Sequence, residues 1–236
     1  MVITTVARHV AERLARWRSA PGLHPHGVLC TGTLTVAARS GTRWGVPWLD
    51  RPGSYPVIVR WSRALGLPQG LPDGLGLAVR VEEADGPDST LDLLFTSSRP
   101  GRFGRHLPLL RPHALKGPYS TLLSYRMGER ERVLAAFPAR DPSGTREGTM
   151  PTLWQELARR PVRFDSVRAA APGEPWTTFA SLSLEATRPA TPSRTVSYDP
   201  YTHCLPGLRP TGPLRALRVA AYTGSRHGRT GDDHDE

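Results

Sequence analysis

Apolar and polar residues alternate along several short segments in the first hundred positions of the chain. The segment 28–37 contains the run Thr-Leu-Thr-Val, and the segment 55–62 reads Tyr-Pro-Val-Ile-Val-Arg-Trp-Ser. The segments 75–82 and 91–95 are rich in Leu and Val. A repeat of two residues matches the alternating side-chain directions of a β-strand, so the pattern predicts a strand at each segment.

The segment 55–62 separates into two faces as a strand. One face carries Val57, Val59 and Trp61, and the other carries Ile58, Arg60 and Ser62. An arginine that points into the protein must meet an anion, because burying an unpaired charge is costly. A ligand carboxylate is one candidate partner for Arg60, and an Asp or Glu of the core is the commoner alternative.

The middle of the chain is predicted to be mainly helical. Apolar spacing indicates helices at 119–136 and 151–159, within an insertion that covers 101–174. Strand patterns then return at 177–185 and 194–198.

Helices are also predicted near both ends, over 1–19 and 213–229. No linker divides the chain, so we predict one domain over 1–236. Its class would be α+β, an antiparallel β-barrel with flanking helices and with barrel strands in 20–100 and 175–212.

Composition excludes several function classes. The formal net charge is +10, yet the basic residues are scattered, no nucleic-acid motif accompanies them, and dedicated nucleic-acid binding is not expected. Cys30 and Cys204 form no metal-binding pair or disulfide framework. No apolar run is long enough to span a membrane, so we expect a cytoplasmic protein. Phosphate-loop, dinucleotide, serine-hydrolase and zinc-protease motifs are missing.

Arg218, Tyr222 and Arg229 would lie within about 40° of one another on a helix. Positive charge beside a phenol favours the phenolate, and tyrosinate is one of the few axial haem ligands that proteins use. The alternative is an ordinary surface helix of an arginine-rich protein.

His24 and His26 stand at the entry to the first predicted strand, on the face of Val28 and Cys30. An imidazole at the start of an inward-facing row could project into a cavity. A partly exposed turn pair without chemistry is the alternative.

Four groups of residues follow one another in a recognisable order. They are His24-Pro-His-Gly27 leading into 27–36, Arg51–Pro56 with Val59–Ser62, Asp73–Val79, and Tyr198–Pro210 followed by Arg218, Tyr222 and Arg229. In order and spacing the chain resembles the haem catalases, most closely the small, single-domain catalase-related proteins of bacteria. The resemblance covers about 20–100 and 175–229.

The resemblance implies a haem site, with iron haem of type b expected. Tyr222 would be the proximal ligand and the metal-binding residue, and Arg218 would hydrogen-bond its phenolate. Arg60 and Arg229 would pair with the haem propionates, because a guanidinium fork suits a carboxylate.

The resemblance also implies a distal side. His24 would take a proton from the peroxide and return it to the leaving oxygen, and Ser62 would orient that imidazole. Asp73 would lie in a substrate channel. The spacing selects His24, and His26 remains its rival.

The sequence departs from the family on this distal side. The family's distal Asn falls near Thr96 and Ser97, and the chain contains no Asn at all. Pro21 and Leu75 stand where the family has arginines. These changes argue against efficient catalase turnover, and the short chain argues against an interlocked tetramer.

The sequence therefore predicts a haem-binding, catalase-like peroxidase. It would use hydrogen peroxide or an organic hydroperoxide and an unidentified electron donor, with room for weak catalase activity. Two alternatives remain open: conversion of fatty-acid hydroperoxides, or a degenerate barrel without turnover. No membrane span is expected, and a homo-oligomer is an open alternative.

Overall fold

The computed structural model describes residues 27–37, 43–65, 67–68, 70–141, 148–186 and 196–211. All of them belong to one compact unit, His26–Thr211. The helices predicted over 1–19 and 213–229 lie outside the described residues, and the single-domain assignment stays a prediction.

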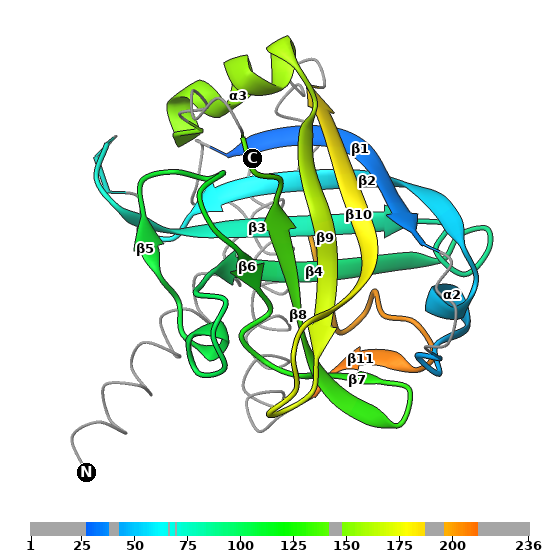
Figure 1. Ribbon diagram of the computed structural model, residues 1–236. Helices are drawn as coiled ribbons and strands as arrows, with labels where there is room; N and C mark the ends of the chain where they lie inside the picture. Colours follow the sequence, from blue (N-terminus) through cyan, green and yellow to red (C-terminus); the bar gives the residue numbers. More distant parts are fainter. Residues whose placement is uncertain are drawn as a thin grey trace, which may run out of the picture. The chain divides into compact units, whose positions relative to one another are not determined.

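The described chain is built on a closed, antiparallel β-barrel of eight strands (Figure 1). Neighbouring strands pair in the order β8-β6-β4-β3-β2-β1-β10-β9, and pairing of β8 with β9 closes the ring. The barrel strands are β1 (Val28–Val36), β2 (Gly53–Arg63), β3 (Asp73–Glu82), β4 (Thr90–Ser97), β6 (Tyr119–Ser120), β8 (Arg130–Pro138), β9 (Val162–Ala170) and β10 (Thr177–Ala186).

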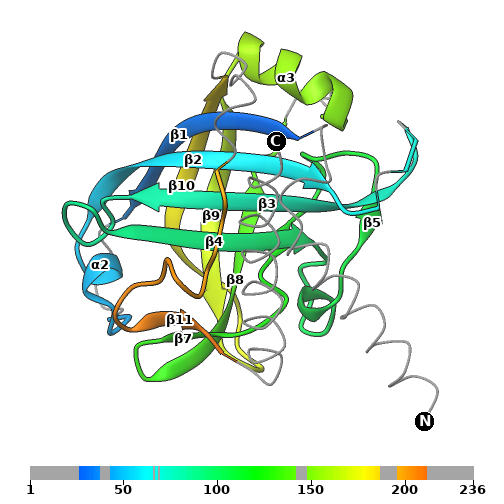
Figure 2. The ribbon, with the colours of Figure 1, turned by 180° about the vertical axis from the view of Figure 1, so that it is seen from behind.

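Shorter elements surround the barrel (Figure 2). Strand β5 (Leu110–Arg111) pairs with the start of β3, and β11 (Leu208–Pro210) pairs with β7 (Tyr125–Met127). The helical elements among the described residues are α2 (Pro47–Asp50), α3 (Met150–Arg159) and a 3-10 turn, Gly104–His106. The α+β class therefore fits only in part, because the described chain is mostly strand.

Large apolar side chains fill the barrel interior. Trp61 is fully buried and stacks on Phe164, with the ring centroids 6.1 Å apart. Its indole Nε1 donates to the hydroxyl of Tyr119 (3.2 Å), which donates in turn to the Ala114 carbonyl (2.7 Å). Burying a side chain of this kind contributes about 2–3 kcal/mol. An eight-stranded barrel is just wide enough to be filled in this way, so a large ligand must bind elsewhere.

Most strand predictions are confirmed. Strands β1, β2, β3, β4 and β10 cover the segments predicted near the start and end of the barrel, and α3 coincides with the helix predicted at 151–159. Along β2, Val57, Val59 and Trp61 are buried in the interior, as the alternation predicts.

The helix predicted at 119–136 is wrong, because the segment contains β6, β7 and most of β8. Met127 pairs with Arg130, so Gly128 and Glu129 form a two-residue hairpin loop. Such loops favour glycine at positive φ, and Gly128 has a φ of 62°. The run that follows in β8 is buried on both sides of the sheet, which removes the alternation that would have marked a strand.

The predicted boundaries of the barrel are also corrected. Strands β6, β8 and β9 complete the barrel from within 101–174, which was predicted to be a helical insertion. A strand was also predicted at 194–198. Residues 196–198, the part of it that the structure describes, do not form a strand.

Among the helices of the described chain, none has the length and apolar character needed to cross a membrane.

Candidate functional site

The outer face of strands β2, β3 and β4 carries the predicted site residues that the structure describes. Because the registers of the three strands are fixed, side chains fall into cross-strand rows. The rows are Ile58–Arg80–Asp92, Arg60–Ala78–Leu94 and Ser62–Gly76–Thr96. Arg60 and Ser62 therefore share this face, as the sequence predicted.

Arg60 is held close to the start of β1. A Cβ atom added to Gly27 would lie 3.0 Å from Nε of Arg60 and 2.9 Å from the carbonyl oxygen of Trp61. Only glycine fits at such distances without a shift of its neighbours. Gly27 is the glycine of the His-x-x-Gly motif, so the motif's end and Arg60 meet at this corner of the outer face.

Strand β3, which lies between β2 and β4, carries a strip of small residues on this face. Gly76 and Ala78 stand in β3 between the β2 residues Ser62 and Arg60 and the corresponding residues of β4. Neither carries a group larger than a methyl. Adjacent strands lie about 4.8 Å apart, so the strip separates β2 from β4 by about 10 Å.

Thr96 is the hydroxyl residue that lies on this face. It is fully buried and shares a row with Ser62. The neighbouring Ser97 is used by the protein itself, since its Oγ donates to the Leu109 carbonyl (2.6 Å) and accepts from the amide of Leu75 (2.9 Å). Of the two residues near the family's Asn position, Thr96 is thus the one placed beside the candidate site.

Asp73 organises the turn between β2 and β3. Its buried carboxylate accepts hydrogen bonds from the amides of Leu65 (2.8 Å) and Leu67 (3.2 Å) and pairs with Nε of Arg63 (3.3 Å). These contacts give Asp73 a structural role, and its predicted place in a substrate channel stays a prediction.

A buried ionic cluster, not predicted from the sequence, lies beside the Arg60 row. The carboxylate of Asp92 is fully buried and accepts from Nε and Nη2 of Arg80, at 2.8 and 2.7 Å. Nδ1 of His203 lies 2.8 Å from the same carboxylate. Hydrogen bonding to Asp92 raises the pKa of Arg80, so the guanidinium stays charged. We call Arg80, Asp92 and His203 the clasp.

The clasp fastens the segment 196–204 to the barrel. Arg80 donates to the Ser197 carbonyl (2.7 Å), and Asp92 accepts from the amide of Asp199 (2.7 Å). Tyr198 lies under the Arg80 guanidinium, 5.3 Å from it, and its hydroxyl donates to the Ile58 carbonyl (3.3 Å). Burial raises the pKa of Tyr198, so its phenol stays protonated.

The clasp could have been suspected only from the strand register. Arg80 and Asp92 have opposite charges and face each other on β3 and β4, which is a favourable cross-strand pair. Nothing in the sequence connects either residue to His203, which is more than a hundred positions away. The resemblance to catalases predicts for Tyr198–Pro210 only an approach to the proximal ligand.

The remaining predicted site residues are not described. His24, Arg218, Tyr222 and Arg229, together with the rival His26, lie outside the described residues. The structure therefore brings Arg60 and Ser62 together and leaves the other positions as predictions. Within the described ranges, no group of three or more His, Cys, Asp or Glu side chains could hold a metal ion.

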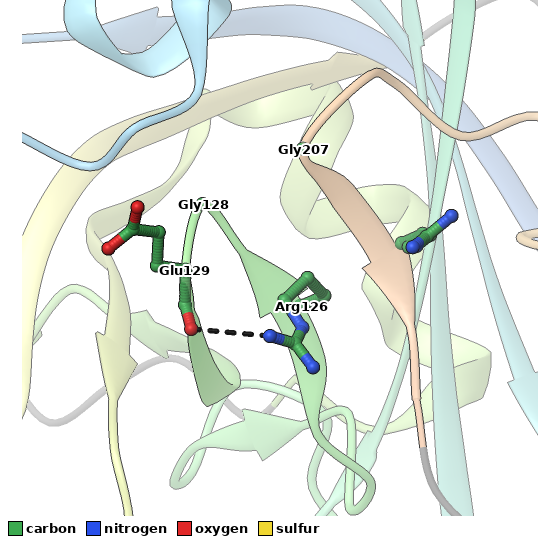
Figure 3. Close-up of a pocket in the computed structure, with 5 residues that line it drawn as sticks. Arg126, Gly128, Glu129 and Gly207 are labelled. Atoms are coloured by element: carbon green, nitrogen blue, oxygen red, sulfur yellow. Dashed lines mark hydrogen bonds between the residues drawn. The ribbon is translucent and has the colours of Figure 1, made fainter.

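A separate surface cavity of about 550 Å³ lies at the β7–β11 pair (Figure 3). It is lined by Arg126, Gly128, Glu129, Gly207 and Arg209. Figure 3 shows Arg126 donating to the main-chain carbonyl of Glu129 (3.3 Å). None of the predicted site residues lines it, and its mixed charges indicate no particular ligand.

The comparisons with known proteins identify the fold. No protein-family model and no curated protein matches the sequence. A fungal catalase crystal structure superposes with a TM-score of 0.64 at 11% identity, over 89% of this chain and 59% of the catalase. A bacterial catalase superposes with a TM-score of 0.63 at 13% identity, over 89% of this chain and 57% of that one.

The chain thus has a catalase-like fold, which confirms the predicted catalase-like barrel. It spans less than three fifths of the length of either catalase. At such low identity the likeness establishes the fold alone.

Proposed function

We propose that this protein binds haem against the outer face of β2–β4 and acts as a peroxidase on hydrogen peroxide or an organic hydroperoxide. The observation that carries the proposal is the common placement of Arg60, Ser62 and Thr96 on one face of a catalase-like barrel.

The described residues fit such a group. Haem is flat, largely apolar and carries two carboxylates. The strip formed by Gly76 and Ala78 would let a flat ligand approach the sheet, and Leu94 adds an apolar side chain beside it. Arg60, held next to Gly27, offers a fork for a carboxylate. Tyr222 would supply the phenolate ligand, Arg218 would keep it ionised, and Arg229 would take the second propionate.

A bound haem would supply an iron centre that passes electrons from a donor to the peroxide. The protein's own part is to bind, orient and move protons. His24 would hold the proton taken from one peroxide oxygen and deliver it to the leaving oxygen, which departs as water or alcohol. Ser62 would hold the orientation of that imidazole through a hydrogen bond. Thr96 would offer a hydroxyl where the family has an amide.

The clasp supports this proposal because it fixes the chain just before the predicted ligand helix. Asp92 and Arg80 hold 196–204 on the barrel, and β11 ends at Pro210. The predicted helix at 213–229 would then start from an anchored point rather than from a free connector.

Reconstitution with haem tests the proposal. The purified protein should bind haem with a ferric-tyrosinate absorption spectrum, and Tyr222→Phe should abolish that spectrum. Tyr55→Phe is the matched control, because Tyr55 packs against Trp48 far along β2 from Ser62. An unchanged spectrum in Tyr222→Phe would rule out the ligand assignment.

Two other outcomes correspond to the alternative functions. The replacement of the family's Asn by Thr96 favours a barrel that binds haem without turnover, which would show the spectrum but no reaction with peroxide. Formation of a rearranged product from a fatty-acid hydroperoxide, without consumption of an electron donor, would instead indicate the lipid-converting alternative.

A further inference from the structure

A buried arginine without a full set of partners lies at the end of the barrel where β5 meets β3. Arg111 is only 7% exposed, and its Nη1 donates to the Pro118 carbonyl (3.1 Å). Its Nε and Nη2 are buried and have no hydrogen-bond partner within the described part of the chain. The guanidinium also lies over the ring of Tyr119, 4.3 Å from the ring centroid, but this contact gives the two N–H groups no acceptor. Burying donors in this state is costly, which points to a missing hydrogen-bond acceptor, and an anion suits a guanidinium best.

Arg111 borders a small, partly open crevice. Its interior volume of about 10 Å³ leaves room for a single water or a single small ion. The crevice is lined by Arg63, Gly70, Leu71, Leu75, Arg111, Pro112, Thr149, Met150 and Pro151.

The start of helix α3 forms one wall of the same crevice. Thr149 is the N-cap of α3, and Met150 and Pro151 are its first residues. The N-terminal end of a helix carries a partial positive charge and favours anions. The helix end and the Arg111 guanidinium are independent features, and both line the same crevice.

Among the described side chains that line the crevice, the charged ones are both arginines. Arg63 and Arg111 both line it, and Asp73 is the neighbouring carboxylate, since it pairs with Arg63 and faces Arg111 across the β3–β5 ladder. These three described side chains, two guanidiniums and one carboxylate, together carry a single positive charge. A monovalent anion would neutralise it.

We propose that this crevice is a binding site for a single halide ion, chloride under ordinary conditions. The ion would accept hydrogen bonds from Nε or Nη2 of Arg111 and lie at the N-terminal end of α3. It would join three segments that are distant in sequence: the turn between β2 and β3, strand β5 and helix α3. The site is separate from the haem proposal and is tested without haem.

Thermal unfolding of the haem-free protein in chloride and in gluconate at equal ionic strength tests the proposal. Gluconate is too large for the crevice and controls for screening of the high net charge. The unfolding midpoint should rise by about 4 °C when chloride exceeds its dissociation constant tenfold, and it should go on rising with the logarithm of the chloride concentration. Equal midpoints in the two salts would overturn the proposal.

Two variants separate the site from general salt effects. Arg111→Met keeps the bulk of the side chain but removes its donors, so the chloride dependence should disappear. Arg126→Met removes an exposed arginine on β7 and should keep the chloride dependence. Loss of the dependence in both variants, or in neither, would contradict the assignment.

A direct measurement keeps the proposal testable if Arg111→Met does not fold. Crystals of the unaltered protein grown in bromide should show an anomalous scattering peak in the crevice beside Arg111. A water molecule there, with no anomalous signal, would refute the halide site.

Discussion

Replacing Asp92 by alanine should destabilise the protein more than any surface charge change. The Asp92 carboxylate is fully buried and accepts from Arg80 at 2.8 and 2.7 Å and from the amide of Asp199 at 2.7 Å. Removing it leaves the Arg80 guanidinium, only 17% exposed, without its counter-ion.

Breaking a buried ion pair by deleting one partner costs about 3–5 kcal/mol. That cost is a large part of the 5–15 kcal/mol that stabilises a typical domain. With a urea dependence of about 2 kcal/mol per molar, the unfolding midpoint should fall by about 1.5–2.5 M. The loss should also release the segment 196–204, so haem uptake should weaken in the same variant.

The urea concentrations at which Asp92→Ala and Glu131→Ala unfold compare the loss of a buried ion pair with the loss of an exposed one. Glu131 forms a matched but exposed pair with Arg126 at 4.0 Å, and its loss should cost less than about 1 kcal/mol. If the two variants unfold at similar urea concentrations, the reasoning about the clasp is wrong.

Three further predictions concern the barrel. Burial raises the pKa of Cys30 to about 12, above its ordinary 9.0. The free energy of unfolding should therefore decline as pH rises from about 9 towards 12, because the thiol ionises more readily in the unfolded chain. Urea titrations in which Cys30→Ala loses stability just as steeply would contradict this. Gly128→Ala should lower the free energy of unfolding by about 3 kcal/mol or more, because the added Cβ would lie 2.4 Å from the Trp44 carbonyl oxygen at a positive φ. Thermal unfolding in which Gly128→Ala loses less stability than Gly101→Ala, at an exposed glycine, would count against it. Tyr119→Phe leaves the buried indole N–H of Trp61 without its acceptor and should cost about 2 kcal/mol in urea unfolding, and an unchanged midpoint would be the contrary result.

Strand β2 shows most clearly why an alternating pattern predicts a strand. Along 55–62 the alternation of Val57, Val59 and Trp61 with more polar residues is preserved because the interior selects every second side chain. The same alternation correctly placed Arg60 and Ser62 together on the opposite face. Local patterns of this kind predict five of the eight barrel strands and the shared face of Arg60 and Ser62.

The error at β8 arose because both sides of this strand are buried. Strand β9 alternates over its first five residues and was missed all the same. Strand β8 has a continuous buried run from Arg132 to Ala136, and a continuous run does not distinguish a strand from a helix. The hairpin loop at Gly128 was the missed signal, since a glycine between two short runs favours a turn.

Other parts of the site depend on contacts that no local pattern encodes. The choice between Thr96 and Ser97 follows from the register of β3 with β4, which places Thr96 opposite Gly76. The clasp requires His203 to meet Asp92 across most of the chain. Long-range pairings of this kind are fixed by the assembled barrel rather than by neighbouring residues.

The most direct test of the central claim is the absorption spectrum of the protein reconstituted with haem, with Arg60→Leu and Arg163→Leu measured in parallel. Arg60 lies on the proposed haem face, whereas Arg163 is an exposed residue of β9. We expect the unaltered protein to take up haem stoichiometrically with a tyrosinate-type spectrum, and Arg163→Leu to do the same. In Arg60→Leu the affinity for haem should fall at least tenfold, because an arginine–carboxylate pair contributes about 1.5–3 kcal/mol. Failure of the unaltered protein to bind haem at micromolar concentration, or equal affinity in both variants, would contradict it.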